Sequence, residues 1–216
     1  MSTLQEDTGG APPVNPATGG RPEMPIDTPQ GLARLLSAAE GLGAREGVDK
    51  WNPPDCGCID MRIGADGVWI YQGTPIGRPA LVRLFASILR REGDRYVLVT
   101  PVEKVGIKVD DVPFLAVEMA RDSATGQLHF RTNLDDAVVV NKDFPLRFSI
   151  DAGGGFRPYV KVRGDLWARL TRALVADLLA QAEERKVDGR SVVGIASGDA
   201  FFPIAETAAF YSEDPA

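Results

Sequence analysis

The chain has 216 residues, of which 44% are hydrophobic and 25% charged, and its 24 basic against 30 acidic residues give a formal net charge of −6. This hydrophobic fraction is enough to build a core, and the acidic balance argues against a uniformly basic nucleic-acid-binding surface while leaving room for a local basic patch. The sequence has no apolar run of 18 residues, and its first ten residues lack the basic and apolar segments of a secretory signal. We therefore expect a cytoplasmic protein with no membrane span and no nucleic-acid partner.

The composition changes near residue 30. Residues 1–29 contain four glycines and six prolines with few bulky apolar side chains, which predicts a mobile arm. A short helix is predicted next, because Thr28 can cap it, Pro29 suits a first helical position, and an apolar stripe follows at Leu32, Leu35, Leu36, Ala39 and Leu42.

The next segment has the pattern of a β-hairpin followed by a helix. Apolar and polar residues alternate over residues 58–63, Asp66-Gly67 is a strong turn signal, and residues 68–71 suit the returning strand. A helix is predicted from Pro79 to Gly93, because its apolar residues repeat at helical spacing, at Leu81, Leu84, Phe85, Ile88 and Leu89.

The rest of the chain is rich in strand signals. Strands are predicted at 96–100, 102–109, 114–120, 128–132, 138–140 and 159–163, with a hairpin turn at 122–126. Leucines at four-residue steps then predict a long amphipathic helix from Asp165 to about Lys186, and short strands at 192–195 and 201–204 complete the pattern.

Two passages share one order of elements, and the leucine stripes that begin at Leu81 and Leu166 lie 85 residues apart (166 − 81). We interpret them as a duplication. The predicted fold is α+β, with two duplicated strand–strand–helix–strand lobes and antiparallel sheets. The predicted lobes are residues 30–143 and residues 144–216.

Two strand ends carry polar groups that suit either a site or plain structure. Pro101 places a bend within the segment Thr100–Lys104, because proline in a strand is confined to edges and bulges, and bulges redirect side chains. The alternative is an edge strand with solvated Glu103 and Lys104. Thr132 and Asn133 begin a polar loop, either as turn-capping residues or as an amide placed beside the other lobe.

A third pattern lies at residues 159–163. Alternation directs Val160 and Val162 to one face of this strand and Tyr159, Lys161 and Arg163 to the other. Arginine binds phosphate through two hydrogen bonds and tyrosine can stack, so this face suits a planar anion. A solvated outer face of a sheet is the alternative.

No catalytic constellation is recognisable, and no cofactor or metal is expected. Cys56 and Cys58 are too close for an unstrained disulfide and are interpreted as structural, reduced residues. The pairs Asp110-Asp111 and Asp135-Asp136 could ligate a hard cation, but adjacent strand residues point to opposite faces, so neither pair converges. His129 has no evident nucleophile to serve.

Many spaced motifs resemble a bacterial family of unknown function, DUF1285, from about Trp51 to Ile204. They are Trp51-x-Pro53, Gly57-x-Ile59-x-Met61-x-Ile63, Asp66-Gly67-x-Trp69-x-Tyr71-x-Gly73-x-Pro75-Ile76, Leu84–Leu89, Tyr96–Lys104, Leu128–Asn133 and Pro158–Arg163. The resemblance implies a duplicated two-lobe core, a C-terminal lobe superficially like a pleckstrin-homology domain, and a site for a nucleotide-like molecule at the lobe interface, with a role in signal transduction. The interface residues it implies are Thr100, Glu103, Lys104, Thr132, Asn133, Tyr159 and Arg163.

These patterns lead to one main hypothesis and two alternatives. The main one is a non-catalytic sensor of a nucleotide-like anion, in which Lys104 and Arg163 hold charge, Tyr159 stacks, and Asn133 with Thr100 contact polar edges. The first alternative is an adaptor that binds a signalling protein and no small ligand. The second is a hydrolase with Glu103 or Asp135 as its base, although no nucleophile or metal site accompanies them. The sequence names neither the ligand nor the oligomeric state.

Overall fold

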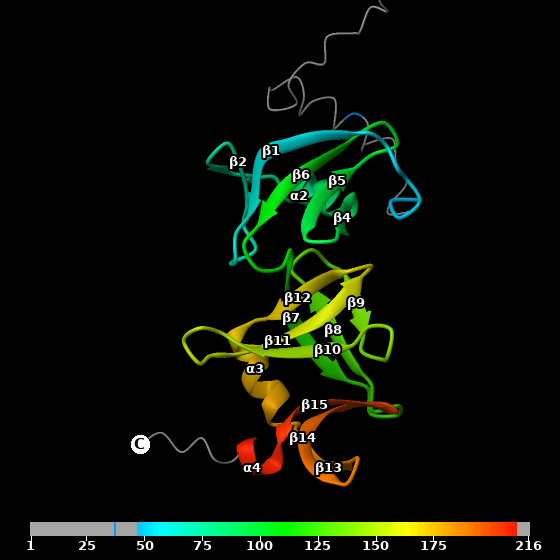
Figure 1. Ribbon diagram of the computed structural model, residues 1–216, viewed down its shortest axis with the longest axis vertical. Coiled ribbons are helices and arrows are strands. Elements are labelled where there is room, and N and C mark those ends of the chain that lie inside the picture. The colour runs from blue at the N-terminus through cyan, green and yellow to red at the C-terminus, as the bar shows by residue number, and fades with distance from the viewer. Residues whose placement is uncertain (1–36, 38–46, 211–216) are drawn as a thin grey trace, which may run out of the picture.

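The protein is described by a computed structural model that covers residues 47–210 and residue 37. Two six-stranded sheets and one three-stranded sheet follow one another along the long axis of the molecule (Figure 1). The arm predicted at 1–29 lies outside the described residues, as does the helix predicted after it, apart from Ser37.

The first sheet has the strand order β3-β2-β1-β6-β5-β4, and its central pair, β1 and β6, is parallel while the other neighbours are antiparallel. Helix α2 (Pro79–Ser87) joins the two halves of this sheet. The strands are β1 (Asp55–Ile63), β2 (Trp69–Tyr71), β3 (Thr74–Pro75), β4 (Leu89–Glu92), β5 (Arg95–Val99) and β6 (Lys104–Val109).

The second sheet repeats this topology with the order β10-β11-β12-β7-β8-β9 and a central parallel pair, β12 and β7. Each six-stranded sheet is thus two three-stranded meanders joined through their first and last strands. The strands are β7 (Phe114–Arg121), β8 (Leu128–Thr132), β9 (Ala137–Val139), β10 (Leu146–Ile150), β11 (Phe156–Arg163) and β12 (Leu166–Leu170).

A smaller unit completes the described chain. Helix α3 (Arg172–Leu179) leads into a three-stranded sheet of β13 (Glu183–Val187), β14 (Arg190–Ser197) and β15 (Ala200–Glu206), followed by the short helix α4 (Thr207–Phe210). None of the helices in the described ranges is long and apolar enough to cross a membrane.

The sheet pairing moves the lobe boundary. Strands β7 to β9 were assigned to the N-terminal lobe by the predicted division at 143/144, but β7 forms the parallel pair with β12 and so belongs to the second sheet. The division between the sheets lies in the linker after Val109 and before Phe114. From here on, "N-terminal lobe" means residues 47–109 and "C-terminal lobe" means residues 113–210.

The predicted helix over residues 165–186 is wrong. Its first part is β12, in which Leu166, Ala168 and Leu170 are all buried. A four-residue step is also two periods of a strand, so the leucine spacing did not distinguish the two structures. Only α3 is helical, and β13, exposed throughout, follows it.

The duplication therefore holds for the sheets and not for the helices. Helix α2 lies between the two meanders of its lobe and ends at Ser87, short of the predicted Gly93, whereas α3 follows both meanders. The lobes are strand-rich with few helices, and the two long-helix units predicted are not present in the described chain.

Apolar packing continues from one lobe into the next. One buried cluster includes Ile63 and Phe85 of the N-terminal lobe, Phe114 and Leu128 of the second sheet, and Ile195 of the last sheet. Because burial of each such side chain is worth roughly 1.5–3 kcal/mol, this shared cluster holds the lobes against each other.

Candidate functional site

The linker between the lobes is held by two successive carboxylates. Asp110 accepts hydrogen bonds from Arg62 of β1 at 2.6 and 2.7 Å, and this guanidinium holds the pKa of Asp110 below its ordinary value. Asp111 turns to the second sheet, where it accepts hydrogen bonds from Arg169 at 3.0 Å and from the Tyr159 hydroxyl at 3.1 Å. The pair diverges as alternation predicts, with one carboxylate for each lobe.

The second acid pair, in the turn between β8 and β9, is divided in the same way. Asp135 pairs with Arg83 of α2 at 2.9 Å across the lobe junction. Asp136, which is only 3% exposed, pairs with Arg163 of its own lobe at 2.8 Å. Among the described residues, no group of three or more His, Cys, Asp or Glu side chains could hold a metal ion.

Arg163 connects the lobes at this junction. Besides Asp136, its guanidinium donates to the carbonyl oxygen of Ala86 in α2 at 2.5 Å and lies 4.9 Å from the centre of the Phe114 ring. A register shift between Lys161 and Arg163 places the arginine opposite Leu166, so its side chain lies on the face of the sheet that carries Leu166 and Phe114. The predicted common face of Tyr159 and Arg163 is therefore wrong. Arg163 is therefore fixed by a buried acid of its own lobe while it donates a hydrogen bond to the other lobe.

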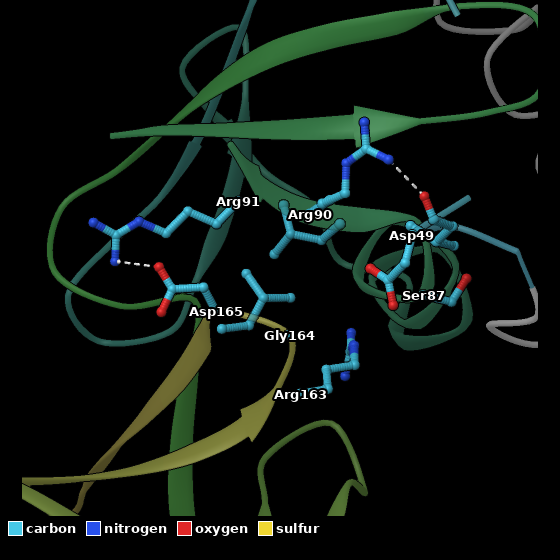
Figure 2. Close-up of a pocket in the computed structure, with 10 residues that line it drawn as sticks. Asp49, Ser87, Arg90, Arg91, Arg163, Gly164 and Asp165 are labelled. Carbon is cyan, nitrogen blue, oxygen red and sulfur yellow. Dashed lines mark hydrogen bonds and ion pairs between the residues drawn. The ribbon is translucent and has the colours of Figure 1, made fainter. Parts of the chain in front are cut away.

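A cleft of about 140 Å³ opens beside Arg163, between the end of α2, strand β4, the segment at residues 48–49 and the turn from β11 to β12 (Figure 2). Three arginines line the cleft together with two acids and small or apolar groups. The lining residues are Val48, Asp49, Ser87, Leu89, Arg90, Arg91, Arg163, Gly164, Asp165 and Leu166.

The neighbouring arginines of β4 run in different directions, as Figure 2 shows. Arg90 donates to the carbonyl oxygens of Val48 and Trp51, each at 2.7 Å, and so holds that segment on the sheet. Arg91 reaches Asp165 in the β11–β12 turn, with 3.5 Å between nitrogen and oxygen, and forms a second charged contact between the lobes.

The size of the cleft limits what it can hold. Sites for small molecules usually measure roughly 300–1,000 Å³, several times the volume of this cleft. A phosphate- or carboxylate-sized group fits such a space, and a nucleoside does not. The lining carries three arginines and two aspartates, so its charge favours an anion.

Around this junction the structure brings together Thr132, Asn133 and Arg163. The Thr132 hydroxyl accepts hydrogen bonds from the backbone N–H groups of Leu134 and Asp136, which shapes the turn that presents Asp136. The Asn133 side-chain oxygen accepts the N–H of Leu115 at 3.0 Å. Of the seven predicted residues, Arg163 is the one that lines the cleft.

Tyr159 lies deeper than a stacking residue would. Its ring is 5% exposed, its hydroxyl is bonded to Asp111, and the Arg147 guanidinium covers it at 4.8 Å from the ring centre. A base could stack on Tyr159 only after Arg147 had moved away.

Thr100, Glu103 and Lys104 lie at the opposite end of β6 from the linker. The Thr100 hydroxyl accepts the N–H of Glu103 at 3.2 Å, and both residues are buried. Lys104 donates to Glu92 at 2.9 Å, and Glu92 also pairs with Arg90. Lys104 is therefore connected to the cleft through two ion pairs and does not line it.

The sequence interpretation missed Arg91 and Asp165, whose ion pair closes one side of the cleft. Both had been placed in helices, where their contact across the lobes could not be foreseen. The signal available was the Gly164-Asp165 dipeptide after a strand, which is typical of a turn.

Comparisons with known proteins agree with this architecture. The family model described as "Domain of unknown function (DUF1285), N-terminal domain" matches residues 46–112. The model described as "Protein of unknown function (DUF1285), C-terminal domain" matches residues 113–204. The border between these matches falls in the linker between the sheets. None of the curated proteins compared matches the chain.

Two crystal structures are similar to this chain. A DUF1285 family protein from Silicibacter pomeroyi DSS-3 is 45% identical with a TM-score of 0.72, over 82% of this chain and 97% of that one. A DUF1285 family protein from Shewanella baltica OS155 is 30% identical with a TM-score of 0.47, over 56% of this chain and 90% of that one. With both domain models matched in order and a relative covered almost throughout, the chain belongs to the DUF1285 family.

Proposed function

We propose that this protein is a non-catalytic binding protein that senses a small anionic ligand in the cleft between its lobes. The observation that carries the proposal is Arg163, which lines the cleft while contacting Asp136 in one lobe and the Ala86 carbonyl in the other. An anion bound beside it acts on a group that both lobes share.

The cleft volume narrows the ligand class. A group the size of phosphate or carboxylate suits the 140 Å³ space, so a nucleotide-like ligand would place only its phosphate there and leave its base outside. Arg91 supplies a second guanidinium from the opposite wall, held by Asp165 at a distance longer than that of a good hydrogen bond.

Binding has a structural consequence in this arrangement. An anion that accepts hydrogen bonds from Arg91 takes the place of Asp165 as the partner of this arginine. The charged contact between the lobes then changes. This proposal includes a role in signal transduction, in which a partner protein recognises the changed contact between the lobes. It also includes the pleckstrin-homology-like character of the C-terminal lobe.

The test is isothermal calorimetry of the full chain with pyrophosphate, AMP and a cyclic nucleotide. We expect pyrophosphate or AMP to bind the wild type, and Arg91→Gln to weaken that binding at least tenfold, because a charge-assisted hydrogen bond contributes about 1.5–3 kcal/mol. Arg190→Gln, an exposed arginine of β14 paired with Glu206, is the control and should bind as the wild type does.

Arg163→Gln is the second variant, with its fold checked by circular dichroism because Asp136 loses its partner. If neither anion binds, or if Arg91→Gln and Arg190→Gln bind equally well, the cleft is not the site. The adaptor alternative then becomes the better prediction.

The hydrolase alternative receives less support from the geometry. Glu103 is 4% exposed, and Asp135 is paired with both Arg83 and Arg131. Either carboxylate would have to be released from these surroundings before it could take a proton from a substrate.

A further inference from the structure

A second and larger groove lies within the C-terminal lobe. Strands β11 and β12 pair as far as Tyr159 and Arg169. Beyond this pair the two strands separate: β12 leads into α3, while the first residues of β11 stay paired with β10. The groove between these diverging segments measures about 610 Å³, within the range typical of small-molecule sites. It is four times the volume of the cleft at the lobe junction.

Three arginines line this groove, although the whole chain has a net charge of −6. Two of them are oriented by acids: Arg157 donates to Asp151 at 2.8 Å, and Arg169 donates to Asp111 at 3.0 Å. Guanidinium groups held in this way keep further N–H donors for a ligand, because each has five.

Arg172 differs from the other two. It is the first residue of α3, it is exposed, and no acid within the described ranges forms an ion pair with it. With Asp151 as the acid that lines the groove against three arginines, the lining is cationic. This is a local basic patch of the kind that the overall charge leaves possible.

Apolar side chains complete the lining of the groove. Phe156, Leu170 and Val175 belong to it, and the Phe156 ring is stacked on Phe148 at 5.6 Å between centres. Because strand residues alternate, Phe156 and Leu170 point to one face of the sheet and Arg157 and Arg169 to the other. A ligand with an apolar body and a charged end can contact both kinds of lining from between the diverging strands.

We infer that this groove binds a phosphomonoester with an aromatic or apolar body, the phosphate held by Arg157, Arg169 and Arg172 and the body resting on Phe156. Phosphate is favoured over carboxylate because it offers two negative charges and three acceptor oxygens to three guanidinium groups. The inference is independent of the cleft at the lobe junction, since the two sites share no lining residue.

The test titrates the full chain with phenyl phosphate, followed by calorimetry and by thermal shift. We expect saturable binding, weakened at least tenfold by Arg172→Gln, which removes a charge without removing a partner from any acid in the described part of the chain. Arg190→Gln is the matched control for loss of an exposed arginine and should bind phenyl phosphate as the wild type does. Arg91→Gln weakens only binding in the cleft, so the saturable binding that remains in this variant is the binding expected in the groove.

Three results would overturn the inference: no saturable binding of phenyl phosphate, equal affinities in Arg172→Gln and Arg190→Gln, or no binding left in Arg91→Gln. Inorganic phosphate, which lacks the apolar body, and phenol, which lacks the phosphate, are the comparison ligands. The inference predicts weaker binding for each of them than for phenyl phosphate, and inorganic phosphate binding as tightly would contradict the role of the apolar lining. Failure here leaves the cleft proposal intact, because that proposal depends on Arg91 and Arg163.

Discussion

The β5–β6 turn and the β8–β9 turn are built alike and are used differently. In each, a fully buried threonine, Thr100 or Thr132, accepts backbone N–H groups from the residues that follow. A buried acid comes next, Glu103 in one turn and Asp136 in the other. The first turn lies far from the linker, whereas the second presents Asp136 to Arg163 at the lobe junction. The same local chemistry is therefore structural in one place and connects two lobes in the other.

The largest effect should follow from removing the acid at the lobe junction. Asp136→Ala leaves Arg163 without its buried partner, and such a loss costs about 3–5 kcal/mol of unfolding free energy. Asp135→Asn is the control next to it, because asparagine tolerates the positive φ of this position, 65°, and the half-exposed pair with Arg83 contributes at most about 1 kcal/mol. Urea unfolding measures both, and equal losses would show that Asp136 has no special role.

A smaller effect separates the two threonines. Thr100→Val and Thr132→Val should each cost about 1–3 kcal/mol, because buried N–H groups lose an acceptor. Combined with Arg163→Gln, Thr132→Val should show a coupling above about 0.5 kcal/mol, while Thr100→Val should be additive because it is remote. Equal coupling for both threonines would contradict the distinction between the turns.

Gly67 offers a finer test of contact between the lobes. Gly67 and Gly73 both have a positive φ, +79° and +73°, so alanine at either position costs about 1–2 kcal/mol in backbone strain. A Cβ at Gly67 would lie 3.0 Å from the side-chain nitrogen of Asn133, whereas a Cβ at Gly73 meets nothing within 4 Å. Gly67→Ala should therefore lower the melting temperature more than Gly73→Ala does, and the reverse order would place Asn133 elsewhere.

The smallest effect concerns the pH dependence of stability at Glu92 of β4, which pairs with Lys104 after the β5–β6 turn. The hydrogen bond from Lys104, followed by that from Arg90, lowers the pKa of Glu92 from its ordinary value of 4.5. These ion pairs therefore stabilise the fold above pH 4.5, and that contribution is lost as the pH falls below it. Glu92→Gln should have a shallower acid limb of unfolding free energy than the wild type, by up to about 1 kcal/mol, with the exposed Glu184→Gln as control. Parallel limbs would count against the contribution of Glu92.

Local signals in the sequence predicted most strands, because alternation and turn residues act within a few positions. The turn at Asp122–Gly126 and the strands around it were predicted correctly. The alternation of β11 was predicted as far as Lys161, but the register shift before Arg163 was not. The lobe boundary was not, since the pairing of Phe114 with Ala168 joins residues 54 positions apart (168 − 114) and leaves no local trace. Propensity and spacing do not encode such a partner.

In the candidate site, too, local patterns in the sequence were informative and contacts between distant residues were not predicted. Arg163 was singled out from the alternation of its strand, but a register shift places its side chain on the other face, beside Phe114. Arg91 and Asp165 could not be singled out, because each was assigned to a helix and their contact depends on how two lobes meet. Tyr159 was expected to be open for stacking, but it is buried under Arg147 of the neighbouring strand β10, which no local pattern shows.

The central parallel pairs also set the order in which the chain can fold during synthesis. In each six-stranded sheet the first strand pairs with the last, so Asp55 meets Lys104, 49 positions later in the chain (104 − 55), only after everything between them has been made. Neither lobe can complete its sheet before its last strand is made, but the N-terminal lobe can do so as soon as β6 leaves the ribosome, before the C-terminal lobe has emerged. The emerging N-terminal lobe would then present a finished surface on which the second sheet assembles.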